Sequence, residues 1–286
     1  RDLVRSRGLG DVYKRQGYIQ GYGRWGDRDK DGGVAGYDFN TYGTLLGAET
    51  LVGQSGLLGA SIGYGRTDVD SADNLSAMDM DSLTTSFYGT WFNQDYYLGM
   101  TVGYGYHSID EVRHLRFAGL RAKGDFKAHT VTIAPEVGKL LQYKSLGIEP
   151  YAGLNYTHFR HESYTEKGAG DASLSVGRDT DDSLSVELGT RLRKTWVFDN
   201  GNYLMPQLRF AWRHDFADET SNTARLAGAD TSFRTTGIAV VSDVFSVGAG
   251  LNWRIDKSKM FYAQYDADFG SGFEAHTLQA SVRIQF

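Results

Sequence analysis

The stretch YYLGMTVGYGYHS (Tyr96–Ser108) sets one kind of side chain against another at every second position. One face carries Leu98, Met100, Val102, Tyr104 and Tyr106. The opposite face carries Gly99, Thr101, Gly103, Gly105 and His107. Successive side chains of an extended chain point to opposite faces of a sheet, so this period of two predicts a β-strand with one apolar face.

The same period of two recurs along the chain from Gly17 onward. It predicts twelve strands, at roughly 17–26, 39–52, 57–68, 82–93, 96–108, 128–142, 146–158, 183–197, 202–214, 243–256, 259–268 and 275–286. Turns of a few residues alternate with longer polar links at 26–38, 69–81, 109–127, 159–182 and 215–242; the last hairpin, around 269–272, is short. Short turns on one rim and long loops on the other are typical of an outer-membrane β-barrel.

Composition removes several classes of protein. The chain of 286 residues has no cysteine, which excludes a disulfide scaffold and a thiolate metal site. Its net charge of −5 is spread in clusters of mixed sign, which argues against nucleic acid as a partner. No apolar run approaches the ~18 residues that a spanning helix needs, so a helical membrane protein is excluded. Spanning strands need only alternating apolar residues and remain compatible with the sequence.

Charged residues share the face opposite the apolar one. They are Glu136, Glu149, Glu187, Arg191, Arg209, Asp266 and Arg283. A soluble barrel or sandwich, the alternative, would have to turn the apolar face inward and leave this face to water. Lipid outside and water inside explain both faces, so we expect an all-β, transmembrane antiparallel barrel of about 12 strands with these residues lining the pore. The charges could pair across the wall or be separately hydrated.

Short catalytic and metal-binding motifs match only in part. GASIG (59–63) lies within a predicted strand, although a nucleophile elbow needs a strand-to-helix turn. GYGRWG (21–26) precedes an acidic loop instead of a phosphate-binding helix. In that loop, four residues occupy calcium-loop positions without flanking helices: Asp27, Asp29, Asp31 and Asp38. His214 and Asp215 would need a nearby serine to form a triad. We therefore expect no enzymatic activity, no cofactor and no metal site, and interpret 26–38 as a solvated loop.

The first residues do not share the pattern of the remainder. Residues 1–16, RDLVRSRGLGDVYKRQ, begin without Met and lack the apolar core of a signal peptide. We interpret them as a truncated linker remnant or a translated cloning adapter, and residues 17–286 as the barrel. The chain is then expected to be the C-terminal part of a longer protein.

Two stretches resemble a known family. GYGRWGDRDKDGGVAGYDFNTYGTLLGAE (21–49) and NWRIDKSKMFYAQYDADFGSGFEAHTLQASVRIQF (252–286) are similar to the autotransporter β-domain, the translocator of type V secretion. The resemblance implies a monomeric twelve-stranded barrel in the lipid of a Gram-negative outer membrane. It also implies an N-terminal passenger that the barrel anchors and helps to export. A porin or channel without a passenger is the alternative, and a barrel-embedded hydrolase is a more distant one.

The resemblance also gives a role to the final strand. In the family, the barrel-assembly machinery of the outer membrane recognises a last strand that ends in an aromatic residue. Val282, Ile284 and Phe286 lie on the apolar face of that strand here and are expected to form this assembly signal. No catalytic residue is carried over from the family.

Overall fold

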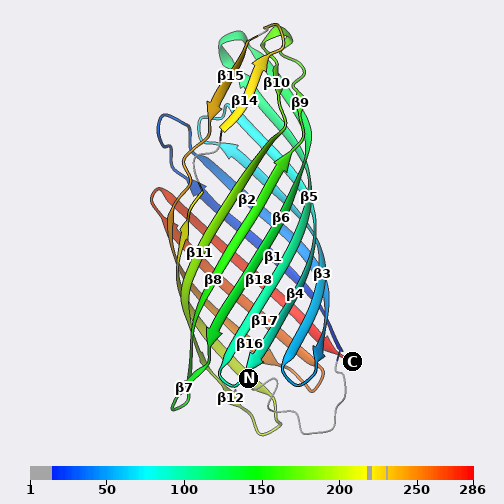
Figure 1. The fold of residues 1–286 in the computed structure, drawn as a ribbon, viewed down its shortest axis with the longest axis vertical. Helices are drawn as coiled ribbons and strands as arrows, with labels where there is room; N and C mark the ends of the chain where they lie inside the picture. Colours follow the sequence, from blue (N-terminus) through cyan, green and yellow to red (C-terminus); the bar gives the residue numbers. More distant parts are fainter. Residues whose placement is uncertain (1–14, 218–220, 230) are drawn as a thin grey trace.

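The wall is a closed antiparallel β-barrel in a computed structural model that describes residues 15–217, 221–229 and 231–286 (Figure 1). It consists of β1 (Arg15–Arg28), β2 (Tyr37–Val52), β3 (Gly56–Ser71), β4 (Ser76–Asn93), β5 (Tyr96–Leu115), β6 (Leu120–Lys139), β8 (Leu146–His161), β11 (Asp179–Lys194), β13 (Tyr203–Asp215), β16 (Asp243–Arg254), β17 (Lys259–Gly270) and β18 (Phe273–Gln285). Two short strands, β7 (Leu141–Tyr143) and β12 (Trp196–Val197), pair with β8 and β13 beside the short turns. The twelve predicted wall strands are confirmed.

The barrel closes where its last strand meets its first. β18 pairs with β1 from Gln16↔Gln285 to Arg28↔Phe273, and the Phe286 amide donates to the carbonyl of Arg15 at 3.0 Å. Of residues 1–16, interpreted above as a linker remnant, 1–14 lie outside the described residues, whereas Arg15 and Gln16 belong to β1. Closure leaves the wall without an unpaired edge strand.

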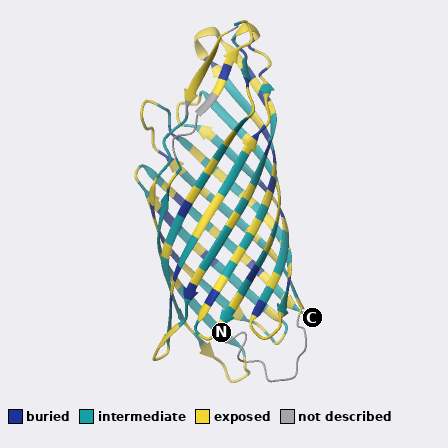
Figure 2. Cartoon of the chain, in the orientation of Figure 1, coloured by how far each residue is buried: buried dark blue, intermediate teal, exposed yellow. Residues whose placement is uncertain are grey.

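The apolar face of the wall points outward. On β5, Leu98 is 53% exposed and Tyr104 is 47% exposed, whereas Tyr97 on the other face is 8% exposed. The same alternation runs along neighbouring strands in Figure 2. In water, this outer surface would be a large exposed apolar patch. In a membrane, the same apolar side chains contact the hydrocarbon of the lipid. The alternative of a soluble barrel is therefore wrong for this part of the wall.

No helix among residues 15–217, 221–229 and 231–286 is long and apolar enough to cross a membrane.

Inward tyrosine rings pack over inward glycines of the next strand. A Cβ atom on Gly189 of β11 would lie 2.5 Å from Cζ of Tyr151 on β8, and one on Gly138 of β6 would lie 2.6 Å from Cζ of Tyr97 on β5. Only a residue without a side chain allows these rings to lie flat on the wall. Both tyrosines are thereby held in position for the polar contacts described below.

Several wall strands are longer than predicted, and the predicted links at 69–81 and 109–127 are wrong. β3 and β4 are joined by residues 72–75 alone, and β5 and β6 by residues 116–119, which include the short helix η1 (Arg116–Ala118). These two hairpins extend the wall on the long-loop side (Figure 1).

The side-chain pattern reverses in this extension. Outward positions are charged: Arg66 on β3 contacts Asp79 and Asp81 on β4 at 3.2 and 3.8 Å. Inward positions are apolar, and Ile109 on β5 is 3% exposed. A barrel surrounded by water hides its apolar residues inside. The reversal therefore places this part of the wall above the lipid, and it explains why the segments resembled polar loops in the sequence.

Two of the remaining long links contain strands that the sequence did not predict. Residues 162–178 contain β9 (Tyr164–Thr165), the helix η2 (Gly170–Ala172) and β10 (Leu174–Val176); residues 216–242 contain β14 (Ser221–Leu226) and β15 (Ser232–Thr236). They form a separate sheet in the order β15-β14-β10-β9 above the barrel (Figure 1). Such short strands carry too few residues for a period of two to be recognised.

Replacing Leu188 with Arg tests the facing of β11. Leu188 is 48% exposed on the outer face, so a charge there should cost about 2–4 kcal/mol of stability in lipid. Ser185, three residues away, points into the interior beside a cavity, so Ser185→Arg should cost much less. Urea unfolding in lipid vesicles measures both. Equal losses of stability would show that the assigned facing is wrong.

Candidate functional site: the polar interior of the barrel

Arg191 is the centre of a set of interior ion pairs near the short turns. From β11, its Nη2 lies 2.8 Å from Oε2 of Glu136 on β6, and its Nη1 lies 2.8 Å from Oε1 of Glu149 on β8. Nη1 also donates to the Tyr97 hydroxyl on β5 at 2.9 Å. One guanidinium thus joins four wall strands through the interior.

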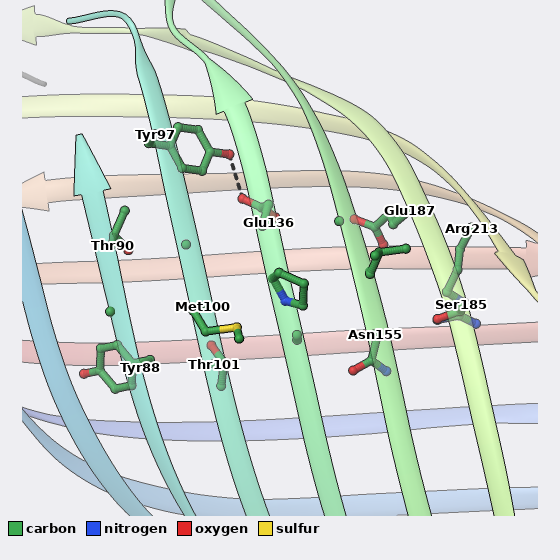
Figure 3. A pocket seen from close by; sticks show the side chains of 16 residues that line it. Tyr88, Thr90, Tyr97, Met100, Thr101, Glu136, Asn155, Ser185, Glu187 and Arg213 are labelled. Carbon is green, nitrogen blue, oxygen red and sulfur yellow. Dashed lines mark hydrogen bonds between the residues drawn. The ribbon is translucent and has the colours of Figure 1, made fainter. Parts of the chain in front are cut away.

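The partners of Arg191 also contact one another. The Tyr97 hydroxyl donates to Glu136 Oε1 at 2.6 Å, as the dashed line in Figure 3 marks. Arg193 Nη1 lies 2.7 Å from Oε2 of Glu149, whose side chain is 5% exposed. A carboxylate this buried is stable as an anion only when cations or donors surround it. Arg191 and Arg193 satisfy that condition for Glu149.

A third arginine extends the network around the wall. Arg209 on β13 contacts Glu187 on β11 at 2.7 Å and Asp266 on β17 at 3.2 Å. Its Nε donates to the Tyr151 hydroxyl at 2.9 Å, and that hydroxyl donates to Glu187 at 2.7 Å. The Arg191 guanidinium lies 3.8 Å from the centre of the Tyr151 ring, which connects the two arginine sites. We call Tyr97, Glu136, Glu149, Tyr151, Glu187, Arg191, Arg193, Arg209 and Asp266 the major cluster.

A smaller cluster lies beside the closing seam. Arg283 Nη1 on β18 is 2.9 Å from Oε1 of Glu49 on β2, and the Tyr88 hydroxyl on β4 lies 3.0 Å from Oε2 of the same carboxylate. The Tyr18 hydroxyl on β1 is 2.9 Å from that of Tyr88. We call Tyr18, Glu49, Tyr88 and Arg283 the seam cluster.

The structure brings the seven charged residues singled out in the sequence into these clusters. Six belong to the major cluster, and Arg283 belongs to the seam cluster. Of the two arrangements left open, pairing across strands is the one observed. The sequence did not single out Arg193, Glu49 or the four tyrosines. These residues occupy the same alternate positions as the inward glycines and threonines, and this was the signal that could have identified them. Only the strand register shows which of them contact one another.

A cavity of about 480 Å³ adjoins the major cluster (Figure 3). Its polar lining includes Thr101, Asn155, Ser185, Glu187 and Arg213. Hydroxyl, amide and charged groups offer both donors and acceptors, so the cavity can hydrate or bind a polar chain.

Further from the short turns, the interior stays polar. Arg24 on β1 lies 2.9 Å from Asp268 on β17 and donates to Thr277 on β18 at 3.2 Å. Ser246 on β16 donates to the same Asp268 at 2.7 Å. Polar side chains therefore follow the interior from the major cluster toward the long loops.

The candidate catalytic groups are not arranged as a triad. His214 Nδ1 contacts Asp243 at 2.9 Å, whereas Asp215 accepts from Ser183 at 3.2 Å, so the neighbouring His214 and Asp215 have different partners. Ser82 Oγ does lie 2.8 Å from His107 Nδ1. The other nitrogen of that imidazole faces the Thr130 hydroxyl at 3.0 Å, where a triad would have a carboxylate.

The acidic residues of the proposed calcium template lie at the long-loop rim. Asp27 on β1 is directly opposite Asp38 on β2, and Asp31 accepts from Arg28 at 3.4 Å. Asp29 begins the connecting loop, where its amide donates to the carbonyl of Gly272 at 2.8 Å. Within the described ranges, no group of three or more His, Cys, Asp or Glu residues is placed to hold a metal ion.

Comparison with known sequences identifies one family. The model of the autotransporter β-domain matches residues 17–266. An extracellular serine protease of Serratia marcescens is 26% identical over 269 residues, which cover 92% of this chain and 25% of the relative. Outer membrane protein B of Rickettsia prowazekii is 23% identical over 286 residues, covering 93% of this chain and 17% of that protein. The chain thus spans a quarter or less of the length of these relatives.

Solved structures share the fold. The translocator domain of the autotransporter NalP from Neisseria meningitidis superposes with a TM-score of 0.80 at 17% identity, covering 100% of this chain and 91% of that one. The β-domain of the Bordetella autotransporter BrkA gives a TM-score of 0.74 at 16% identity, covering 95% of this chain and 99% of that one. At these identities, the likeness is one of fold.

Replacing Arg191 with Met tests whether the major cluster stabilises the barrel. Glu136 would lose its cation and Glu149 one of two, so we expect a loss of about 1–3 kcal/mol in urea unfolding. Adding Glu136→Gln to Arg191→Met should recover part of the loss, because one uncompensated carboxylate is removed. Unchanged stability in Arg191→Met would contradict a structural role for the cluster.

Proposed function

This chain belongs to the autotransporter β-domain family, and we propose that it anchors an N-terminal passenger and assists its export to the cell surface. The barrel lies in the outer membrane of a Gram-negative bacterium, as its family and its apolar outer face indicate. The observation that carries the proposal is the match of the β-domain family to nearly the whole wall of a barrel whose interior is polar. The matched region makes up 25% of the Serratia relative and 17% of the Rickettsia relative. The remainder of each relative leaves room for a passenger.

We propose that the interior supports export as a hydrated polar surface and has no active site. An unfolded passenger carries backbone amides and carbonyls that must stay hydrogen-bonded during passage. Water and the polar lining supply these bonds. The charges of the major cluster are already paired with one another, so they stabilise the wall without holding a passing chain in place. Folding of the passenger outside the cell would then supply the direction of transport.

The other candidate functions have less support. A channel without a passenger fits the barrel but not the small share of each relative that the chain covers. The protease activity in the name of the Serratia relative belongs to that protein, and the matched family is the β-domain. We propose that this chain has no catalytic role of its own, since its interior Ser82–His107 pair has a threonine where a triad carboxylate would lie.

We also propose that Val282, Ile284 and Phe286 are the signal that the barrel-assembly machinery recognises. They lie at the closing seam: Val282 is opposite Ile19 and Ile284 is opposite Gly17 on β1. The Phe286 ring covers Gly17, where an added Cβ would be 3.6 Å from Cε1. Recognition of this strand would hold it until it pairs with β1. The closed wall has no free edge for a second copy, so we propose a monomer.

A reporter fused to the N-terminus tests export. We expect a small cysteine-free reporter to reach the surface of intact cells, where added protease removes it. A second form that lacks Phe286 separates assembly from transport: folded, heat-modifiable barrel and surface reporter should fall together. A folded barrel in the outer membrane with its reporter protected in the periplasm would contradict the proposed function.

A further inference from the structure

An uncharged segment lies at the long-loop mouth of the barrel. Residues 237–242, GIAVVS, connect β15 to β16. Residues 237–241 are half-buried, whereas residues 231–235 of β15 and the loop before it are exposed. Surface connections usually carry polar side chains. A connection that is mostly apolar and half-buried therefore indicates that it packs on another apolar surface. We call residues 237–242 the strap.

Beneath the strap lies a group of large apolar side chains. Ile238 lines a cavity of about 670 Å³ together with residues from seven wall strands, and the charged ones among them are Glu111, Arg113 and Asp181. The large aliphatic, Met and Phe side chains of the wall among them are Val69 on β3, Met78 and Met80 on β4, Ile109 on β5, Phe126 on β6 and Phe159 on β8. We call these six residues the collar. They occupy the part of the wall above the lipid, where the side-chain pattern is reversed.

The strap is fastened at the β1 side of the mouth by a buried arginine. Arg28, 8% exposed at the end of β1, donates from Nη2 to the carbonyl of Ala239 at 3.2 Å. Its Nη1 donates to the carbonyls of Ser271 and Gly272 in the β17–β18 turn, the latter at 3.1 Å. Arg28 therefore joins the strap to the end of β1 and to the β17–β18 turn.

The strap also reaches other parts of the rim. Val240 lines a separate cavity with Phe159 of β8 and Asp181 of β11. β8 is the sixth neighbour of β1 in either direction around the wall, which makes it the opposite side of the mouth. Beside β16, the carbonyl of Ser242 accepts from the Asp215 amide at 2.7 Å. The strap thus runs from the β1 side toward β8 and β11.

The β9 segment packs on the collar through a stacked pair of rings. The Tyr164 ring on β9 lies 4.3 Å from that of Phe126, with 10° between the planes. The Tyr164 hydroxyl donates to Glu111 at 2.8 Å, and next to it Glu166 contacts Arg113 at 2.6 Å. These polar contacts hold the β9 segment against β5 above the collar.

We propose that the strap and the collar form a hydrophobic seal that closes the extracellular mouth to ions and small polar solutes, with Arg28 as its latch. A narrow apolar passage excludes water, and an ion cannot enter it without losing its hydration. The polar interior below would remain hydrated while the mouth stays closed. The seal is a property of the barrel itself and does not depend on the proposed export of a passenger.

A single thiol in the strap tests the seal, since the chain has no cysteine of its own. The Ile238→Cys variant is purified, and its fold is checked by heat-modifiable migration in gel electrophoresis. Its conductance is then recorded in a planar lipid bilayer. We expect low conductance that rises several-fold when a negatively charged thiol reagent is added, because the charge hydrates the collar. High conductance before the reagent, or no change after it, would overturn the seal.

Two further variants complete the test. Phe117→Cys is the control, because Phe117 is 86% exposed in the β5–β6 turn and modification there should leave conductance unchanged. Arg28→Gln in the Ile238→Cys chain should speed labelling at position 238 several-fold, since the strap loses its latch. An equal labelling rate with and without Arg28→Gln would overturn the latch. Loss of passenger export alone would bear only on the proposed function.

Discussion

Closure of the backbone hydrogen-bond network is the constraint on which this structure depends. Hydrocarbon offers no partner to an amide or a carbonyl, so each wall strand must pair on both sides. The pairing of β18 with β1 completes the ring. Once the ring is closed, every residue faces either outward or inward, and the medium on each side selects the side chain. Leu98 and Leu188 face lipid, whereas Glu136 and Arg191 face the interior.

The same wall meets a second medium at its long-loop end. There the outer face carries Arg66 with its aspartates, and the inner face carries Ile109 and the other collar residues. One continuous strand such as β5 therefore changes its amphipathic sense along its length without a break. The interior accordingly has a polar part, which is braced by ion pairs near the short turns and continues along β1 and β16–β18, and a mainly apolar part at the long-loop end of β3–β8.

How far the sequence predicted this structure depends on the period of two. Where lipid selects the outer residues, the alternation in YYLGMTVGYGYHS was sufficient, and the twelve wall strands were predicted. Above the lipid, residues 109–127 were assigned to a loop because polar residues moved to the outer face. The alternation also identified the charged residues that face the interior, but it did not identify their partners. Arg191 meets Tyr97 only because four strands pair in one register, which no local pattern encodes.

The reversal of facing along β5 is the central claim, and an accessibility scan of that strand tests it most directly. Nitroxide labels are placed one at a time at positions 98–113, and their exposure to oxygen in lipid and to a water-soluble paramagnet is measured. Even-numbered positions from 98 to 106 should be accessible from lipid, and positions 108 and 110 from water, with position 109 shielded from both. Lipid accessibility that continues through 108 and 110, or appears at the odd-numbered positions, would contradict the account.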